Sequence, residues 1–459
     1  MIDFRQIVEN NKELIIKKTQ ELIMIPSVLD ETTKSEDAPF GIKIKEALDF
    51  MVNLAKDDGF IVEEDGGYAA HAAYGNPNGK IIGVLCHLDV VPEGTNWKFP
   101  PYSATIVDGK MYGRGTTDDK GPTMAAYFAL KFIKDVGIKL KNQIRIIFAT
   151  DEETGWRGIN HYLQKFPMPD LGFAPDACFP LIYGEKGRMS FDLTLNKWDQ
   201  NDVLVSISGG ERYNVVLEEV KAVVKKDLSK PFETYAKANN LEYSITLNNN
   251  LYELVLKGKA AHAMEPEKGI NAGTHMCNFL KDYSNNLLVK YVAQCHHLSH
   301  FCEKLGLDYN DFEMGPITCN IGIMNINENS SRLTLDLRYP VRYDVANFNQ
   351  KFETIISKYE LSITAKTNKT PHYVSPEDDL VKLLYQAYVK NTGDNVNKPF
   401  TIGGGTYASI LEKAVAYGMM MPDEEELAHQ RNEYLNLETL FKGILIYIDA
   451  MLSLGEIDA

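Results

Sequence analysis

The chain has 459 residues, and its 63 acidic side chains against 48 Lys and Arg give a formal net charge of −15 at pH 7. This length exceeds what one hydrophobic core usually supports, so two or more domains are expected. The negative charge argues against nucleic-acid and anionic-membrane partners, and no apolar run approaches the roughly 18 residues that span a bilayer.

The elements predicted for the first third of the chain alternate between helix and strand. Apolar residues recur at helical spacing from Phe4 until Pro26 ends the pattern. The following elements are expected in chain order: a helix over 42–55, strands near 60–62, 68–73 and 81–86, a helix opened by Gly121-Pro122, and a strand over 143–150. This alternation predicts an α/β fold with a central mixed, mostly parallel sheet and a site along its carboxyl edge.

The pattern changes after residue 187. Segments 189–195, 251–257 and 332–337 alternate apolar and polar residues like half-exposed antiparallel strands. From about 374 the chain returns to helices and turns, with a final helix near 437–454. We therefore predict a discontinuous catalytic domain, 1–187 and 371–459, and an inserted α+β domain over 188–370.

The start of the chain shows no basic segment followed by an apolar core, so no secretory signal is expected. The six cysteines have no CxxC spacing and are interpreted as reduced thiols. Both features predict a cytoplasmic protein.

The apolar run 81–86 is followed by a histidine and, two residues later, an aspartate. Side chains two apart on an extended segment point to the same side, so Asp89 is expected to hold the ring of His87. A carboxylate that orients a liganding imidazole is common at metal sites. A plain His–Asp hydrogen bond at a strand end explains this stretch equally well.

Four further loop stretches carry acids or a histidine after apolar runs. They contain Asp118-Asp119, Glu152-Glu153, Asp176 and His429. Each alone is typical of a solvated turn or helix start. Together with His87 they offer two imidazoles and several carboxylates, which suits zinc first, and also manganese or cobalt.

In their order along the chain, these motifs resemble the aminoacylase/carboxypeptidase-G family of dinuclear-metal exopeptidases and deacylases. The resemblance covers nearly the whole chain and is strongest to the bacterial beta-Ala-Xaa (Xaa-His, carnosinase-like) dipeptidases. It rests on the stretches 87–92, 118–121, 152–153, 176, 258–263, 335–340, 403–407 and 429.

The resemblance implies which residues hold the two divalent ions. Asp118 would bridge them, and the bond between residues 118 and 119 would be cis. His87 with Asp176 would complete one ligand shell, and Glu153 with His429 the other.

The resemblance also implies the catalytic and recognition residues. Glu152 would be the general base, Asp89 would orient His87, and His262 would stabilise the oxyanion. Arg338 is expected to bind the C-terminal carboxylate of a small peptide substrate, with backbone N–H groups of Gly403, Gly404 and Gly405 adding to that site.

In this dipeptidase branch the inserted domain is a lid that supplies the histidine from the same chain, which implies a monomer. The cluster of His296, His297 and His300 is interpreted as a wet helix face rather than as another metal site.

Three functions are compatible with these motifs. The preferred one is a metallo-dipeptidase that recognises both ends of a short peptide. The alternative is an N-acyl-amino-acid deacylase or desuccinylase with the same metal chemistry. A binding protein that has lost catalysis is disfavoured, because Glu152, Asp118 and His262 are all present.

Overall fold

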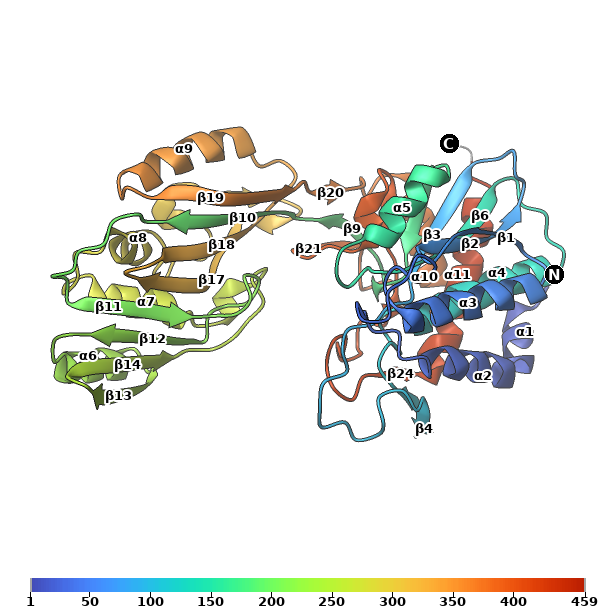
Figure 1. Cartoon of the computed structure of the whole chain (residues 1–459). Helices are drawn as coiled ribbons and strands as arrows, with labels where there is room; N and C mark the ends of the chain where they lie inside the picture. The colour runs from blue at the N-terminus through green and yellow to red at the C-terminus, as the bar shows by residue number, and fades with distance from the viewer. Residues whose placement is uncertain (1, 458–459) are drawn as a thin grey trace. The chain divides into compact units, whose positions relative to one another are not determined.

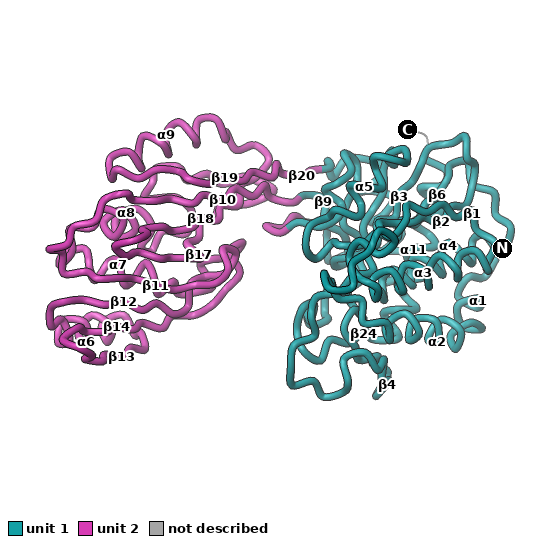
Figure 2. The backbone as a smooth tube through the Cα atoms, in the orientation of Figure 1, with its two compact units in different colours: residues 1–184, 374–400, 405–459 teal, residues 185–373, 401–404 magenta. Residues whose placement is uncertain are grey.

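The computed structural model describes residues 2–457, which form two compact units (Figure 2). Unit 1 comprises residues 1–184, 374–400 and 405–459, and unit 2 comprises 185–373 and 401–404. The chain passes between units within three residues of the two boundaries that the sequence suggested. Residues 401–404 group with unit 2, whereas the sequence-based division put them in the catalytic domain.

Unit 1 is built from helices and a large sheet (Figure 1). Its helices are α1 (Phe4–Asn10), α2 (Lys12–Ile23), α3 (Ile42–Asp57), α4 (Lys120–Asp135), α5 (Arg157–Lys165), α10 (Asp379–Thr392), α11 (Leu437–Gly455) and the 3-10 turn η3 (Tyr407–Ile410). Its strands are β1 (Ile61–Asp65), β2 (Ala69–Gly75), β3 (Ile81–His87), β4 (Thr105–Val107), β5 (Lys110–Tyr112), β6 (Gln143–Ala149), β7 (Leu171–Ala174), β8 (Ala177–Cys178), β22 (Ala414–Ala416), β23 (Met419–Met420) and β24 (Tyr434–Asn436), and β9 (Ile182–Glu185) and β21 (Phe400–Ile402) run across its boundary.

The sheet of unit 1 has the order β1-β2-β6-β3-β7-β22-β9. The four central strands β6, β3, β7 and β22 pair in parallel, and the outer pairs are antiparallel. The mixed sheet is as expected, but parallel pairing is confined to its centre. Helix α4 packs against β3 and β6, and α11 packs on α4.

The parallel centre of the sheet brings distant acids and a histidine to one edge. His87 is the last residue of β3, and β6 ends two residues before Asp151. Strand β7 ends two residues before Asp176. Because parallel strands end at the same edge, the loops that follow them lie side by side.

Unit 2 is an antiparallel sheet covered by helices. The strand order is β13-β14-β12-β11-β17-β18-β10-β19, and every pair in it is antiparallel. Its strands are β10 (Gly187–Thr194), β11 (Leu204–Gly209), β12 (Glu219–Val224), β13 (Glu242–Asn248), β14 (Leu251–Lys257), β17 (Thr318–Asn327), β18 (Ser331–Tyr339) and β19 (Ser362–Lys369), with short strands β15 (Asn310–Asp311), β16 (Gly315–Pro316) and β20 (His372–Tyr373). Its helices are α6 (Ser229–Ala238), α7 (Ala272–Leu280), α8 (Leu287–Cys295), α9 (Val345–Ser357) and the 3-10 turns η1 (Pro266–Lys268) and η2 (Glu303–Leu305).

Two elements differ from the sequence-based expectations. The first helix is two helices, α1 and α2, which meet at Asn11. Strand β18 is almost wholly buried rather than half-exposed, because its polar side chains are paired: Thr334 donates to Asp192, and Arg338 donates to Asp336.

The histidine cluster of unit 2 is not a wet helix face. Helix α8 ends at Cys295, and His296 and His297 are buried. Nε2 of His296 lies 2.9 Å from the hydroxyl of Tyr291, which explains how a polar ring is accommodated there.

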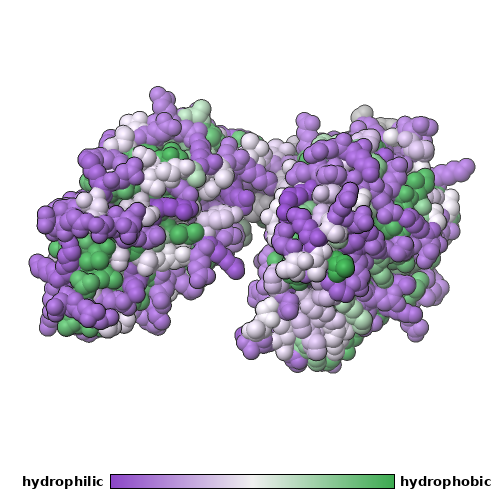
Figure 3. Space-filling view, viewed as in Figure 1, coloured by the Kyte–Doolittle hydropathy of each residue, from purple (hydrophilic) through white to green (hydrophobic). Residues whose placement is uncertain are grey.

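The face of the molecule in Figure 3 is mainly hydrophilic on both units, with scattered apolar patches. Among the residues that the structure describes, no helix combines the length and apolar character needed to cross a bilayer. All six cysteines are free thiols.

Candidate metal centre

His87 ends the central strand with its side chain fully buried. Its Nδ1 lies 3.0 Å from the backbone carbonyl oxygen of Asp89 and 3.6 Å from the carboxylate Oδ1 of the same residue. The carboxylate instead accepts hydrogen bonds from the backbone N–H groups of Glu152 and Glu153, at 3.0 and 3.1 Å. Asp89 therefore orients the ring mainly through its carbonyl and fixes the Glu152-Glu153 loop through its side chain, which corrects the sequence-based interpretation.

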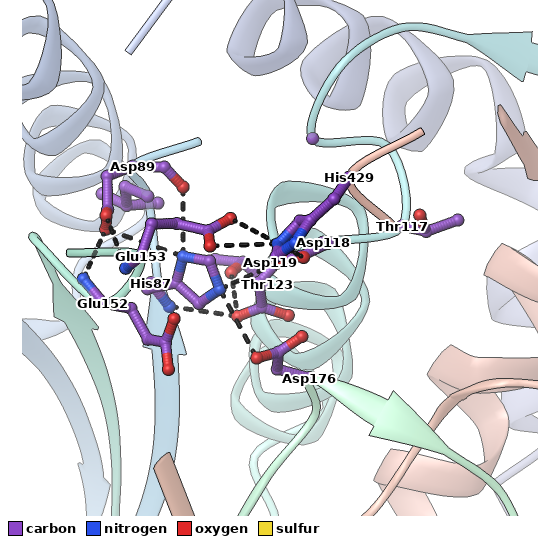
Figure 4. A network of polar contacts seen from close by, with 12 residues as sticks. His87, Asp89, Thr117, Asp118, Asp119, Thr123, Glu152, Glu153, Asp176 and His429 are labelled. Atoms are coloured by element: carbon purple, nitrogen blue, oxygen red, sulfur yellow. Dashed lines mark hydrogen bonds and ion pairs between the residues drawn. The ribbon is translucent and has the colours of Figure 1, made fainter. Parts of the chain in front are cut away.

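The structure distinguishes the two adjacent aspartates just before α4. Oδ1 of Asp118 lies 3.0 Å from Nε2 of His87, and Oδ2 lies 3.0 Å from Nε2 of His429 (Figure 4). Asp119 makes different contacts: its Oδ2 accepts from the backbone N–H of His87 and from the hydroxyl of Thr123. The bond between Asp118 and Asp119 is cis, as the resemblance implied. Only Asp118 is thus placed between two imidazoles.

The remaining candidates complete two groups of donor atoms around Asp118. Donor atoms of His87, Glu152 and Asp176 lie within 4.8 Å of one another, and so do those of Asp118, Glu153 and His429. Oε2 of Glu153 is 3.0 Å from Nε2 of His429, and Oδ2 of Asp176 is 3.5 Å from Nε2 of His87. The predicted ligands therefore converge, and Glu152 lies among them.

The electrostatics of the site reflect many acids gathered around two histidines. Hydrogen bonds that the His429 ring donates to Asp118 and Glu153 raise the pKa of His429 to about 10. Burial raises the pKa of Glu152 to about 8, and burial also raises the pKa of Glu153 and Asp176. Burial acts to raise the pKa of Asp118, but its close contacts with His429 and His87 hold that pKa below its usual value. Without cations the cluster retains protons, because so many carboxylates cannot all ionise together.

Two buried polar atoms indicate that divalent ions fit between these side chains. Nε2 of His87 and Oδ1 of Asp118 are buried and lie 3.0 Å apart, but neither makes a well-aligned hydrogen bond in the described part of the chain. Burying such atoms without partners is unfavourable. An imidazole nitrogen and a carboxylate oxygen are both good zinc ligands, so these residues fit a bound cation.

Sequence reasoning missed three side chains that organise this centre. The fully buried carboxylate of Glu433 accepts from Arg114, from the backbone N–H groups of Gly115 and Thr117, and from the Thr117 hydroxyl, at 2.7–3.1 Å. It ties the loop before Asp118 to the loop after His429. Trp156 donates to Glu152, and Tyr407 packs against Trp156 and His87. Glu433 lies only four residues after His429, but the sequence pattern gives no sign of its partners.

In unit 2, the ring of His262 has a defined tautomer. The backbone N–H of Met264 donates to Nδ1 of His262 at 3.1 Å, so the ring proton of the neutral form sits on Nε2. Partial desolvation and then the positive charge of Arg338 lower the pKa of this histidine. The neutral ring can therefore donate one hydrogen bond from Nε2 near pH 7.

Arg338 is buried and held by Asp336, to which its Nε and Nη2 donate at 2.6 and 3.2 Å. Its Nη1 donates to the carbonyl oxygen of Gly403 at 3.3 Å. A Cβ at Gly403 would lie 2.7 Å from Cβ of Met264, so only glycine allows this close approach. Arg338, Gly403 and Gly404 thus belong to one assembly in unit 2, whereas Gly405 belongs to unit 1.

Comparison with known proteins finds relatives that match nearly the whole chain. The profile of "Peptidase family M20/M25/M40" matches residues 83–453. Two proteins named "Putative dipeptidase", from Staphylococcus aureus strains bovine RF122 / ET3-1 and USA300, are each 38% identical over 466 residues, which covers 98% of this chain and 99% of theirs.

Solved structures share the fold at low identity. Human carnosine dipeptidase 1 matches with a TM-score of 0.57 and 16% identity, over 99% of this chain and 98% of that one. The dipeptidase Dug1p from Saccharomyces cerevisiae matches with a TM-score of 0.58 and 14% identity, over 99% of this chain and 98% of that one. Aminoacylhistidine dipeptidase from Vibrio alginolyticus matches with a TM-score of 0.58 and 13% identity, over 96% of this chain and 95% of that one.

Proposed function

Because the chain belongs to peptidase family M20/M25/M40 and is a hydrolase of the metallopeptidase class, we propose that it is a dinuclear metal-dependent dipeptidase. One observation carries this proposal. The two carboxylate oxygens of Asp118 each lie 3.0 Å from the Nε2 atom of a different histidine, His87 or His429. A carboxylate between two sets of ligands is the arrangement that a bridged pair of ions requires.

The proposed ligands are His87 and Asp176 on one side, Glu153 and His429 on the other, and Asp118 between them. Zinc is the expected ion, with manganese or cobalt as alternatives, since imidazole and carboxylate ligands serve all three. Two such ions, when bound, lower the pKa of a water molecule and polarise the carbonyl group of the substrate.

Glu152 is proposed as the general base and, later, as the general acid. It would take a proton from the attacking water and deliver it to the departing amine. Its carboxyl group is mostly buried beside the ligands, and positive charge at the ligand sites would counter the effect of burial on its pKa. Asp89 supports this role by holding the backbone N–H of Glu152.

His262 and Arg338 are proposed to complete catalysis and recognition from the inserted domain of the same chain, which would act as a lid. The Nε2 proton of His262 suits donation to the oxyanion of the tetrahedral intermediate. Arg338 is already held on one side by Asp336, so its guanidinium is oriented before it meets the C-terminal carboxylate of a dipeptide. Backbone N–H groups in the 403–405 loop would add to this anion site.

A matched set of substrates tests the dipeptidase proposal. The set contains a free dipeptide, its N-acetylated form, its C-terminal amide and a tripeptide, each incubated with zinc- or manganese-loaded protein. Cleavage confined to the free dipeptide is expected. Cleavage of the N-acylated compound in preference to the free dipeptide would move the assignment to an N-acyl-amino-acid deacylase or desuccinylase with the same metal site.

A further inference from the structure

Trp156 lies at the end of the loop that carries Glu152. Its indole Nε1–H donates to Oε1 of Glu152 at 3.0 Å. Oε2 of Glu152 has no hydrogen-bond partner among residues 2–457. The indole thus engages one carboxylate oxygen and leaves the other available.

The position of the indole is fixed by its surroundings. Trp156 has a left-handed backbone (φ 58°), an uncommon conformation for a bulky residue, and its N–H donates to the Asp151 carbonyl at 2.7 Å. The Asp151 carboxylate in turn accepts from the backbone and guanidinium of Arg157. On its other side the indole meets the ring of Tyr407 edge-on, with centroids 5.3 Å apart.

Tyr407 connects the indole to the metal ligands. Its fully buried ring also meets His87 edge-on, with centroids 6.0 Å apart. Edge-to-face aromatic pairs have preferred geometries, so rotation of either partner is resisted. Trp156, Tyr407 and His87 therefore form a continuous packed row from the proposed base to a proposed ligand.

We propose that Trp156 is a positioning residue for Glu152: its indole N–H holds Oε1 so that Oε2 faces the water molecule and then the leaving amine. This inference rests on the proposed function, in which Glu152 is the base. When one carboxylate oxygen is held by a hydrogen bond, the other oxygen stays in the orientation that transfers the proton. A freely rotating carboxylate adopts that orientation less often. The role requires the N–H group and not merely an aromatic ring.

The first test is Trp156→Phe, which keeps a ring against Tyr407 and removes the N–H. We expect kcat for a dipeptide to fall by roughly ten- to a hundredfold, with KM and the number of bound ions per chain unchanged. The matched control is Trp97→Phe, because the Trp97 indole N–H donates to a backbone carbonyl, that of Glu93, at 2.7 Å. This control should leave kcat unchanged.

A double-mutant comparison separates positioning from general structural support. In a Glu152→Gln background, Trp156→Phe should cause no further loss of the residual rate, because the group that it positions is already disabled. Replacement of Trp156 by benzothienylalanine, in which sulfur takes the place of the N–H, preserves the ring shape and should reproduce the fall in kcat even if the phenylalanine variant folds poorly.

The inference is overturned if the benzothienylalanine protein keeps wild-type kcat, or if Trp156→Phe lowers the rate equally in both backgrounds. Normal turnover by Glu152→Gln alone would be a different failure. Such a result would show that Glu152 is not the base and so contradict the proposed function. It would be observed in the Glu152→Gln variant alone, without any substitution of Trp156.

Discussion

His262 shows how a single hydrogen bond sets what a side chain can do. Because the Met264 N–H occupies Nδ1, the neutral ring presents a donor at Nε2. We expect His262→Ala to lower kcat by about 10²–10³-fold, the usual loss for one oxyanion donor. The metal content should not change, since no proposed ligand lies in unit 2. Steady-state kinetics with metal analysis would check this, and an unchanged kcat would remove His262 from the mechanism.

The protonation of His429 leads to a pH prediction. Asp118 and Glu153 raise its pKa to about 10, so the metal-free protein carries a proton on this ring at pH 7. An ion needs the unprotonated nitrogen, so binding must release protons. Apparent metal affinity should therefore rise with pH between about 6 and 10 and fall as the solution is acidified.

Calorimetric titration of the metal-free protein in buffers with different ionisation enthalpies measures this proton release directly. His429→Ala should release fewer protons per bound ion. If the binding heat did not depend on the buffer, His429 would not exchange its proton for an ion.

Some residues of the site could be predicted from the sequence and others could not. The candidate ligands follow apolar runs and could be found from order and spacing. The roles of Asp89 and Glu433 could not be found in this way, because each carboxylate accepts from backbone N–H groups that come together only in the folded loops. Asp89 receives those of Glu152 and Glu153, more than 60 positions away, and Glu433 receives those of a loop more than 300 positions away.

Among the elements, the loop that leads into α4 is held by one buried carboxylate, that of Glu433. Glu433 and Arg114 form a buried ion pair at 2.7 Å, and the same carboxylate caps the backbone of Gly115 and Thr117. Glu433→Ala leaves a buried arginine and several N–H groups without their partner. We expect a loss of about 3–5 kcal/mol in unfolding free energy.

Urea unfolding of the metal-free protein measures that loss. The control is Glu412→Ala, which changes an exposed acid of the same unit and should shift stability by less than about 0.5 kcal/mol. If both variants were equally stable, the Glu433 network would not support the loop that carries Asp118.

Element prediction succeeded where burial and periodicity agreed. Strand β3 and helix α11 were found within one residue at each end. The first is a short apolar run preceded by a turn, and the second is too long for a strand, so length and flanking residues decided both. The wrong predictions concerned polar side chains that are buried because they find hydrogen-bond partners in the folded protein. Strand β18 buries polar residues because Asp192 and Arg338 satisfy them, and His296 is buried against Tyr291.

For the whole molecule, the central question is whether His262 acts in the chain that carries it. We expect the protein to work as a monomer. A mixture of Glu152→Gln and His262→Ala chains should then stay as inactive as the two separate proteins. Recovery of activity on mixing would show that histidines are exchanged between subunits and would contradict the monomer proposal.

The two-ion site and the role of Glu152 are tested together by measuring the metal count per chain and the turnover of wild-type protein and of Glu152→Gln. Donor atoms of Glu152 lie within 4.8 Å of those of His87 and Asp176, so the residue is close enough to be a ligand or a base. We expect two ions per chain in both proteins and turnover only in the wild type. A single ion in the variant, or full turnover with both ions bound, would contradict the assignment of Glu152 as the base beside a two-ion site.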